Sequence, residues 1–359
     1  MSNIVFCNIA WMNRYCGITE IDQPMNGGSW VGENNDAMEA FNFLPYRGKC
    51  YGFVEHHGSA LRLERVDKTA TKASVLDDVT VVWVATGEEG SRIVGWYEKA
   101  EMHRECQEFL DGSCFYFVTP VETAYRIPVN KRNFEMPRAS QNGKGRGMGQ
   151  SNVWYADSEW AKEFYIPKVM EYLNEIRQDC RIVGFTAEER RNATAIPNKT
   201  QDELLELAST ADNEGDTLRG LQILNQILVQ DKGIGHAWVM HGLALEEMLC
   251  FDEAIEDYKR ALENFTAGQV TAGLDIDCKE KLSRLYRITG KNFLAWHMEE
   301  KILEDYRRIN NTDGMVESLL EMMSIAKEEN DRERLNKLIA DYDAIGTDHL
   351  ADEVAAYRK

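Results

Sequence analysis

The segment 143–160, GKGRGMGQSNVWYADSEW, combines the residue types that a nucleotide site needs. Its four glycines let the backbone approach a ligand closely, and cations, amides, a hydroxyl and ring faces follow within a few residues. This mixture suits a flat, polar ligand that carries phosphate. A glycine-rich loop that only leads into a helix is the alternative. The side chains that could bind such a ligand here are Lys144, Arg146, Gln150, Ser151, Asn152 and Trp154.

Positive charge gathers just before and within this segment, although the chain carries a net charge of −19. Residues 1–200 hold 23 Lys and Arg against 27 Asp and Glu, whereas residues 201–359 hold 18 against 33, so the acidity belongs to the second half. Residues 126–146 have six cations and only Glu135, which is an electrostatic footprint for phosphate. We assign phosphate binding to Arg138, Lys144 and Arg146, and an ordinary basic loop to Arg126, Lys131 and Arg132.

Catalytic signatures are missing from the sequence. It contains no GxSxG, HExxH, Walker loop or kinase motif. His103, Cys106 and Cys114 have no fourth metal ligand nearby, so they make a weak zinc signal. We therefore predict no catalytic residue, no metal and no cofactor, and we favour a binding function over an enzymatic one.

The first half alternates as strands do, and turn signals separate its segments. The strands are expected at 3–10, 50–56, 60–66, 79–85, 92–100 and 114–120. Six short strands in this length predict a small, mostly antiparallel β-barrel with a few helices, an α+β domain. Residues 158–178 change to a helical period, with Trp160, Phe164 and Leu173 on one face.

The second half is helical, and one stretch of it fits the pattern of tetratricopeptide repeats closely. In 236–265, Trp238 is followed by Gly242, Ala254, Tyr258 and Ala261 at the spacing that lets two antiparallel helices touch. Looser copies at 217–233, 281–306 and 314–342 bring the total to about four helical hairpins, an all-α repeat domain. Such arrays have a concave face that binds a peptide or protein. A dimer surface, or a lid on the first domain, is the alternative use.

These patterns divide the chain into three parts. Residues 1–190 form the strand-rich domain, 191–203 a polar linker, and 204–359 the helical repeats. The longest apolar runs, such as 79–85, are too short to cross a bilayer. The first residues lack the basic start and cleavage site of a signal peptide, and the eight cysteines form no CxxC pair. We expect a cytoplasmic protein that does not bind membranes.

Several stretches of the first half resemble a known module. They are IVFCNIAWMNRY, FNFLPYRGKCYGFV, VVWVATGEEGSRIVGWYEKAEMHRE and MPRASQNGKGRGMGQSNVWYADS. Together they resemble, over about residues 1–180, the N-terminal module of some bacterial HNH-endonuclease proteins. That module is similar to the PUA-like superfamily of EVE, YTH and ASCH domains. The resemblance implies a PUA-like barrel that binds a modified base flipped into an aromatic pocket, and it implies a role in bacterial anti-phage restriction. The HNH histidines are absent, so any cleavage belongs to a partner.

A flipped base costs a few kcal/mol to unstack, and each aromatic stack returns about 1–3 kcal/mol. The candidate pocket residues are Asn8, Trp11, Tyr15, Asn42, Trp96, Tyr97, Gln150, Ser151, Asn152 and Trp154. Trp83 lies in an apolar strand and is assigned to the core. Trp96 and Tyr97 are adjacent on a strand and face opposite ways, so one of them is expected in the core. Trp30 is a further ring of this half.

The leading hypothesis is a reader of modified nucleic acid, with DNA favoured over RNA, that is coupled through its repeats to a partner effector. Because the repeats are acidic, they should face away from nucleic acid and bind a basic protein partner. One alternative is a small enzyme that acts on nucleotides or modified bases. Another is a protein–protein adaptor without nucleic-acid binding. A homodimer formed through the repeats is compatible with each.

Overall fold

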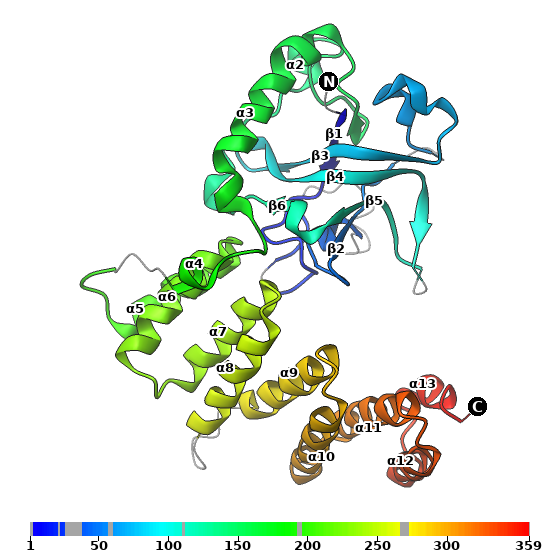
Figure 1. Ribbon diagram of the computed structural model, residues 1–359, viewed down its shortest axis with the longest axis vertical. Coiled ribbons are helices and arrows are strands. Elements are labelled where there is room, and N and C mark those ends of the chain that lie inside the picture. Colours follow the sequence, from blue (N-terminus) through cyan, green and yellow to red (C-terminus); the bar gives the residue numbers. More distant parts are fainter. Residues whose placement is uncertain are drawn as a thin grey trace. The chain divides into compact units, whose positions relative to one another are not determined.

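The computed structural model describes residues 3–20, 22–25, 38–56, 60–109, 112–191, 196–265 and 273–358. Trp30 lies outside these ranges. The chain forms two compact units, Met1–Ile223 and Leu224–Lys359, which are called unit 1 and unit 2 below. Figure 1 shows the strands in the first part of the chain and a succession of helices in the rest.

Unit 1 is built on one mixed sheet with the strand order β2-β5-β4-β3-β1-β7, and β6 pairs with β4 beside this path. The parallel pair is β1 with β3, whereas the other pairings are antiparallel. The strands are β1 (Asn3–Ile9), β2 (Lys49–Gly52), β3 (Val75–Gly87), β4 (Gly90–Glu108), β5 (Cys114–Pro120), β6 (Ala124–Arg126) and β7 (Val153–Trp154). Among the described strands, this path stays open between β2 and β7, so the expected closed barrel is not formed.

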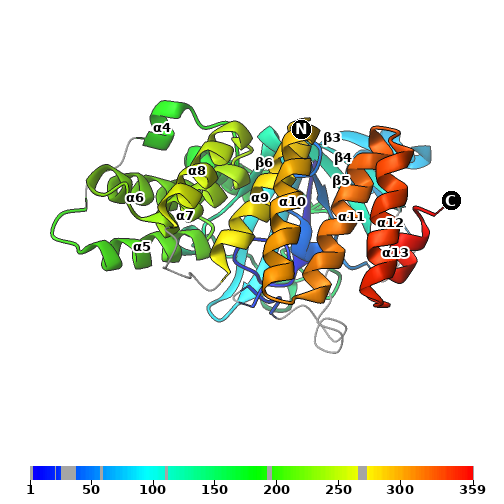
Figure 2. The same cartoon turned by 90° about the horizontal axis from the view of Figure 1, so that it is seen from below.

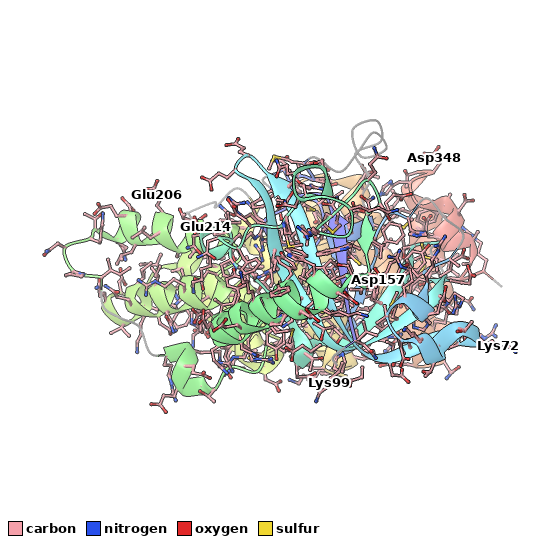
Figure 3. The ribbon with its side chains drawn as sticks, turned by 90° about the horizontal axis from the view of Figure 1, so that it is seen from above. Lys72, Lys99, Asp157, Glu206, Glu214 and Asp348 are labelled. Atoms are coloured by element: carbon pink, nitrogen blue, oxygen red, sulfur yellow. The ribbon has the colours of Figure 1, made fainter. Side chains whose placement is uncertain are left out.

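Five of the six expected strands are present. The prediction of a strand at 60–66 is wrong. Leu63–Arg65 is a short 3₁₀-helix instead. Leu61 and Leu63 are buried, so the alternation of apolar residues does mark an inward face. One backbone bond, from the Leu61 amide to the Arg104 carbonyl of β4 at 2.7 Å, joins the segment to the sheet. Side chains hold the rest, because the Arg62 amide donates to the Tyr155 hydroxyl and Arg65 pairs with Asp157 at 2.8 Å. Asp157 is labelled in Figure 3.

A hydrophobic core of unit 1 lies between the sheet and α3 (Ile166–Ile176), a helix preceded by one turn of π-helix at Ala161–Tyr165. Phe6, Trp154 and Tyr165 pack together here, with ring centroids 4.9–6.0 Å apart. The helical period expected at 158–178 is confirmed, although Phe164 is exposed. Two short helices, α2 (Ala139–Asn142) and α4 (Ala187–Arg191), complete this part of the chain.

Unit 1 continues past the linker predicted at 191–203, because it includes α5 (Gln201–Asn213) and the first turns of α6 (Thr217–Gln230). Thr200 and Glu203 form a capping box that begins α5. The buried Arg126 of β6 donates to the carbonyl of Gly215 at 3.3 Å and to the Thr217 hydroxyl at 3.2 Å. These bonds fasten the turn between the two helices to the sheet.

Unit 2 consists of antiparallel helices that follow one another along the chain and lie side by side in Figures 1 and 2. Gly242 lies against the ring of Tyr258, and Trp238, Leu245 and Tyr258 are buried as the repeat pattern predicts. The described residues therefore form a helical repeat domain. Its helices are α7 (Gly235–Glu247), α8 (Phe251–Asn264), α9 (Leu274–Ile288), α10 (Asn292–Arg308), α11 (Thr312–Glu328), α12 (Arg332–Ile345) and α13 (Ala351–Ala355).

None of the described helices combines the length and the apolar character that a membrane crossing requires.

Candidate functional site

Four of the predicted pocket residues lie in the core of unit 1. Tyr15, Asn42, Trp96 and Tyr97 are fully buried. Trp96 stacks on Tyr125 with centroids 4.6 Å apart, and the Tyr97 hydroxyl donates to the backbone carbonyl of Asn42. Both sides of β4 are covered at this point, so neither of its adjacent rings presents a face to solvent.

Trp154 and Trp11 also have close neighbours within the chain. Trp154 packs against Phe6 in the core between the sheet and α3. The partly exposed Trp11 lies against Gly87, where an added Cβ would come within 3.0 Å of the indole, and the guanidinium of Arg132 lies 4.9 Å from the ring. Trp11 is therefore the ring among the predicted set that remains nearest to solvent.

The carboxyl end of β1 brings together two of the predicted amide side chains. The Asn8 Nδ2 donates to Asn152 Oδ1 at 3.3 Å, and the Asn152 Nδ2 donates to the carbonyl of Glu55 at 3.1 Å. The Asn8 Oδ1 is buried and has no hydrogen-bond partner among the described residues. Such an atom is expected to bind a water or a ligand. Gln150 and Ser151 are exposed beside this pair.

The three predicted phosphate-binding cations differ in their surroundings. Arg138 is bound to the hydroxyls of Ser91 at 2.9 Å and Thr86 at 2.6 Å, so its guanidinium braces the β3–β4 hairpin. Lys144 and Arg146 are exposed, and neither has a described carboxylate within 4.0 Å. These two side chains remain available to an anion.

One glycine of this loop has a structural explanation. Gly147 has a φ of +132°, and a Cβ there would lie 2.1 Å from the carbonyl oxygen of Pro137. Only glycine fits such a position without a shift of the backbone. Close approach of the loop to its own chain therefore accounts for part of the glycine pattern.

A second candidate site lies in unit 2. A groove with a volume of about 760 Å³ opens between α9, α10 and α11, and it is called the α9–α11 groove below. The apolar part of its lining is Ile288, Ile302, Leu320 and Leu350, and the polar part is Glu280, Arg284, Arg287, Glu299, Glu317, Ser318, Glu321 and Glu328.

Acidic side chains outnumber cations in the α9–α11 groove, and its cations are already engaged. Arg287 pairs with Glu321 at 2.5 Å and Glu328 at 2.6 Å, whereas Arg284 pairs with Glu246. The groove therefore presents uncompensated negative charge to whatever enters it.

Glu299 is the most unusual group of the groove. Its side chain comes from α10 and is only 5% exposed. The Ser318 hydroxyl donates to its Oε2 at 2.8 Å. Burial raises the pKa of this carboxyl to about 7, although hydrogen bonds from Ser283 and Ser318 oppose the rise. Glu299 is thus poised to change its charge near neutral pH.

Nearby carboxylates raise the pKa of the Tyr306 hydroxyl, which donates a hydrogen bond to Glu280. Burial and this bond raise its pKa, and Glu317 and Glu299 raise it further. Carboxylates from α9, α10 and α11 therefore all influence one hydroxyl. The acidity of the repeats is visible in the sequence, but this grouping is not, because its members are 18 or more positions apart.

Comparisons with known proteins give no family for the chain. No protein-family profile and no curated protein matches it. Solved structures with some likeness include MamA, with 17% identity and a TM-score of 0.35 over 42% of this chain and 80% of that one. The TPR-like repeats of a kinesin light chain from Podosopora anserina share 13% identity, with a TM-score of 0.34 over 52% of this chain and 90% of the other.

The pilF protein of Pseudomonas aeruginosa shares 14% identity, with a TM-score of 0.34 over 55% of this chain and 83% of that chain. At these scores, the assignment of helical repeats rests on the helix packing itself. The PUA-like character expected of unit 1 has no counterpart among these structures.

Proposed function

We propose that the protein is an adaptor, and that unit 2 binds a polypeptide segment of a partner protein in the α9–α11 groove. The observation that carries this proposal is an open groove whose lining combines apolar side chains with excess negative charge. Its volume is in the range of binding clefts, about 300–1,000 Å³. Stacked helical hairpins offer an elongated surface, which suits a chain segment better than a compact ligand.

The test uses two isoleucines with matched exposure. Ile288 lines the groove and is 51% exposed, whereas Ile309 lies at the end of α10, is 54% exposed and is not among the groove residues. Random dodecapeptides displayed on ribosomes are selected on the full-length protein. We expect the selected peptides to lose affinity for Ile288→Asp and to keep it for Ile309→Asp. Equal affinity for both variants, or no enriched peptide, would refute binding in this groove.

A second function, recognition of modified nucleic acid, is proposed for unit 1. It is favoured by the resemblance of residues 1–180 to modified-base readers, by the unpartnered Asn8 Oδ1 and by the exposed Lys144 and Arg146. Together the two functions would bring a partner effector to modified DNA, as in anti-phage restriction. The buried rings leave Trp11 as the stacking residue of this proposal.

The test of this second function is the salt dependence of binding to oligonucleotides with plain and modified bases. Each phosphate contact contributes about 0.9 to the slope of log affinity against log salt. Replacement of Lys144 and Arg146 by Gln should therefore flatten the slope by up to about 1.8. The control replaces Lys72 and Lys99, two exposed lysines labelled in Figure 3, and should leave the slope unchanged. An equal slope in the Lys144/Arg146 variant would contradict the proposal.

A further inference from the structure

We infer, on the premise that the α9–α11 groove binds a polypeptide, that the bound segment carries a lysine whose ammonium group lies among Glu280, Glu299 and Glu317. The groove leaves negative charge without a counter-ion, and a lysine of the partner would supply that counter-ion.

Glu299 is a buried carboxyl without a cation. It is 95% buried, because only 5% of its surface is exposed, yet it lines an open groove. Among the described residues, no Lys, Arg or His nitrogen lies within 4.0 Å of its carboxylate. Buried carboxylates in proteins are paired, bind a metal or take up a proton. The groove leaves room for a partner to supply the missing positive charge.

Glu280 and Glu317, the other two carboxylates, are also without a Lys or Arg partner among the described residues. Glu280 accepts a hydrogen bond from a neutral hydroxyl, that of Tyr306. Within the described part of the chain, the ion-pair partner of Glu317 is His349 at 3.9 Å, and that imidazole is charged only when protonated. Because Arg284 and Arg287 are engaged by other glutamates, they do not neutralise the three carboxylates. A cation that enters the groove therefore finds carboxylates from three helices along its lining.

Lysine fits these acceptors better than arginine or a metal ion. Its ammonium is a compact charge with three donors that can point to separate acceptors, whereas a guanidinium prefers both oxygens of one carboxylate. Glu280 and Glu299 each already accept a hydrogen bond from a hydroxyl, so a guanidinium that bound either of them through both oxygens would share one oxygen with that hydroxyl. Ile288 and Leu320 supply apolar surface for the methylene stem. The described residues hold no group of three or more His, Cys, Asp or Glu suited to a metal.

The experiment uses the ribosome-displayed dodecapeptides and the full-length protein. Peptides whose binding depends on Ile288 are sequenced, and we expect them to share a lysine at one position. Acetylation of that lysine, or its replacement by norleucine or arginine, should weaken binding at least tenfold while the protein stays unchanged. A peptide that binds through Ile288 without a lysine, or equally well with arginine, overturns the lysine inference and leaves the groove function standing. The absence of any peptide that depends on Ile288 removes the premise as well.

Protein variants provide the reciprocal test. The double replacement Glu280→Gln and Glu317→Gln keeps an acceptor for the Tyr306 hydroxyl, and it should weaken the lysine peptide at least tenfold. Glu333→Gln, at an exposed position of α12 outside the groove, is the control and should not change the affinity. Far-UV circular dichroism verifies the fold of each variant. Unchanged affinity in the folded double variant would overturn the inference.

Discussion

Replacement of Glu299 by Gln should change how the stability of the protein depends on pH. Burial raises the pKa of this carboxyl from its ordinary value of 4.5 to about 7, and the charges of Glu321 and Glu280 contribute. Because the folded state holds the proton more tightly, the contribution of this group is greatest below about pH 4.5. It is lost as the pH rises to about 7. The rise in pKa from 4.5 to about 7 corresponds to about 3.4 kcal/mol, at about 1.36 kcal/mol for each unit of pKa.

The assay is urea unfolding followed by far-UV circular dichroism at about pH 5 and about pH 8. Over this interval, the wild-type carboxyl should lose about 2.5 kcal/mol of the free energy of unfolding. Glutamine has nearly the same shape and cannot ionise, so the difference between variant and wild type isolates this group. Glu333→Gln should follow the wild type at both pH values, because Glu333 is exposed.

The groups that face Glu299 must be considered in this comparison. Ser283 and Glu280 come from α9, Tyr306 shares α10, and Ser318 and Glu321 come from α11. They are the same in wild type and variant, so their own titration largely cancels in the difference. If the stability of Glu299→Gln falls between the two pH values by as much as that of the wild type, the raised pKa is refuted.

Three further substitutions test the packing. Gly242→Val should lower the free energy of unfolding by about 1–3 kcal/mol, because its Cβ would lie 2.9 Å from the Tyr258 ring; unchanged urea unfolding would contradict this. Gly147→Ala should cost more than about 1 kcal/mol, since the new Cβ meets the carbonyl of Pro137; thermal unfolding measures it, and an unaltered transition would show that the loop adjusts. Arg126→Met should expose the α5–α6 turn to faster hydrogen exchange, and equal exchange rates would show that its bonds do not hold the turn.

The helical repeats could be predicted because their signal is periodic and local. Gly242 and Tyr258 meet in the structure as their spacing requires. The strands at 79–85 and 92–100 were predictable for the same reason, although β3 and β4 are longer than these segments. Residues 60–66 show the limit of such patterns. A few alternating apolar residues mark an inward face, but a short 3₁₀-helix fastened by side chains satisfies the same pattern.

The candidate sites were harder to predict, because accessibility depends on tertiary packing. Trp96 has the residue type of a stacking platform, yet β6 places Tyr125 against its ring. The sequence cannot show which aromatic side chains will be covered, since core and ligand sites use the same residues. Likewise, Glu299 is one of many glutamates in the repeats, and only the folding of three helices together buries it.

Glu299 also connects stability with binding in this protein. Above about pH 7, a buried ionised carboxyl without a cation works against folding, so glutamine would suit the isolated unit better. A lysine in the α9–α11 groove would favour the ionised form and recover that free energy on binding. Stability and affinity should therefore respond to Glu299→Gln in opposite directions at about pH 8. The variant should unfold at higher urea concentration and bind the lysine peptide more weakly. A variant that gains stability and keeps full affinity would show that Glu299 lines the groove without contributing to the binding of the lysine.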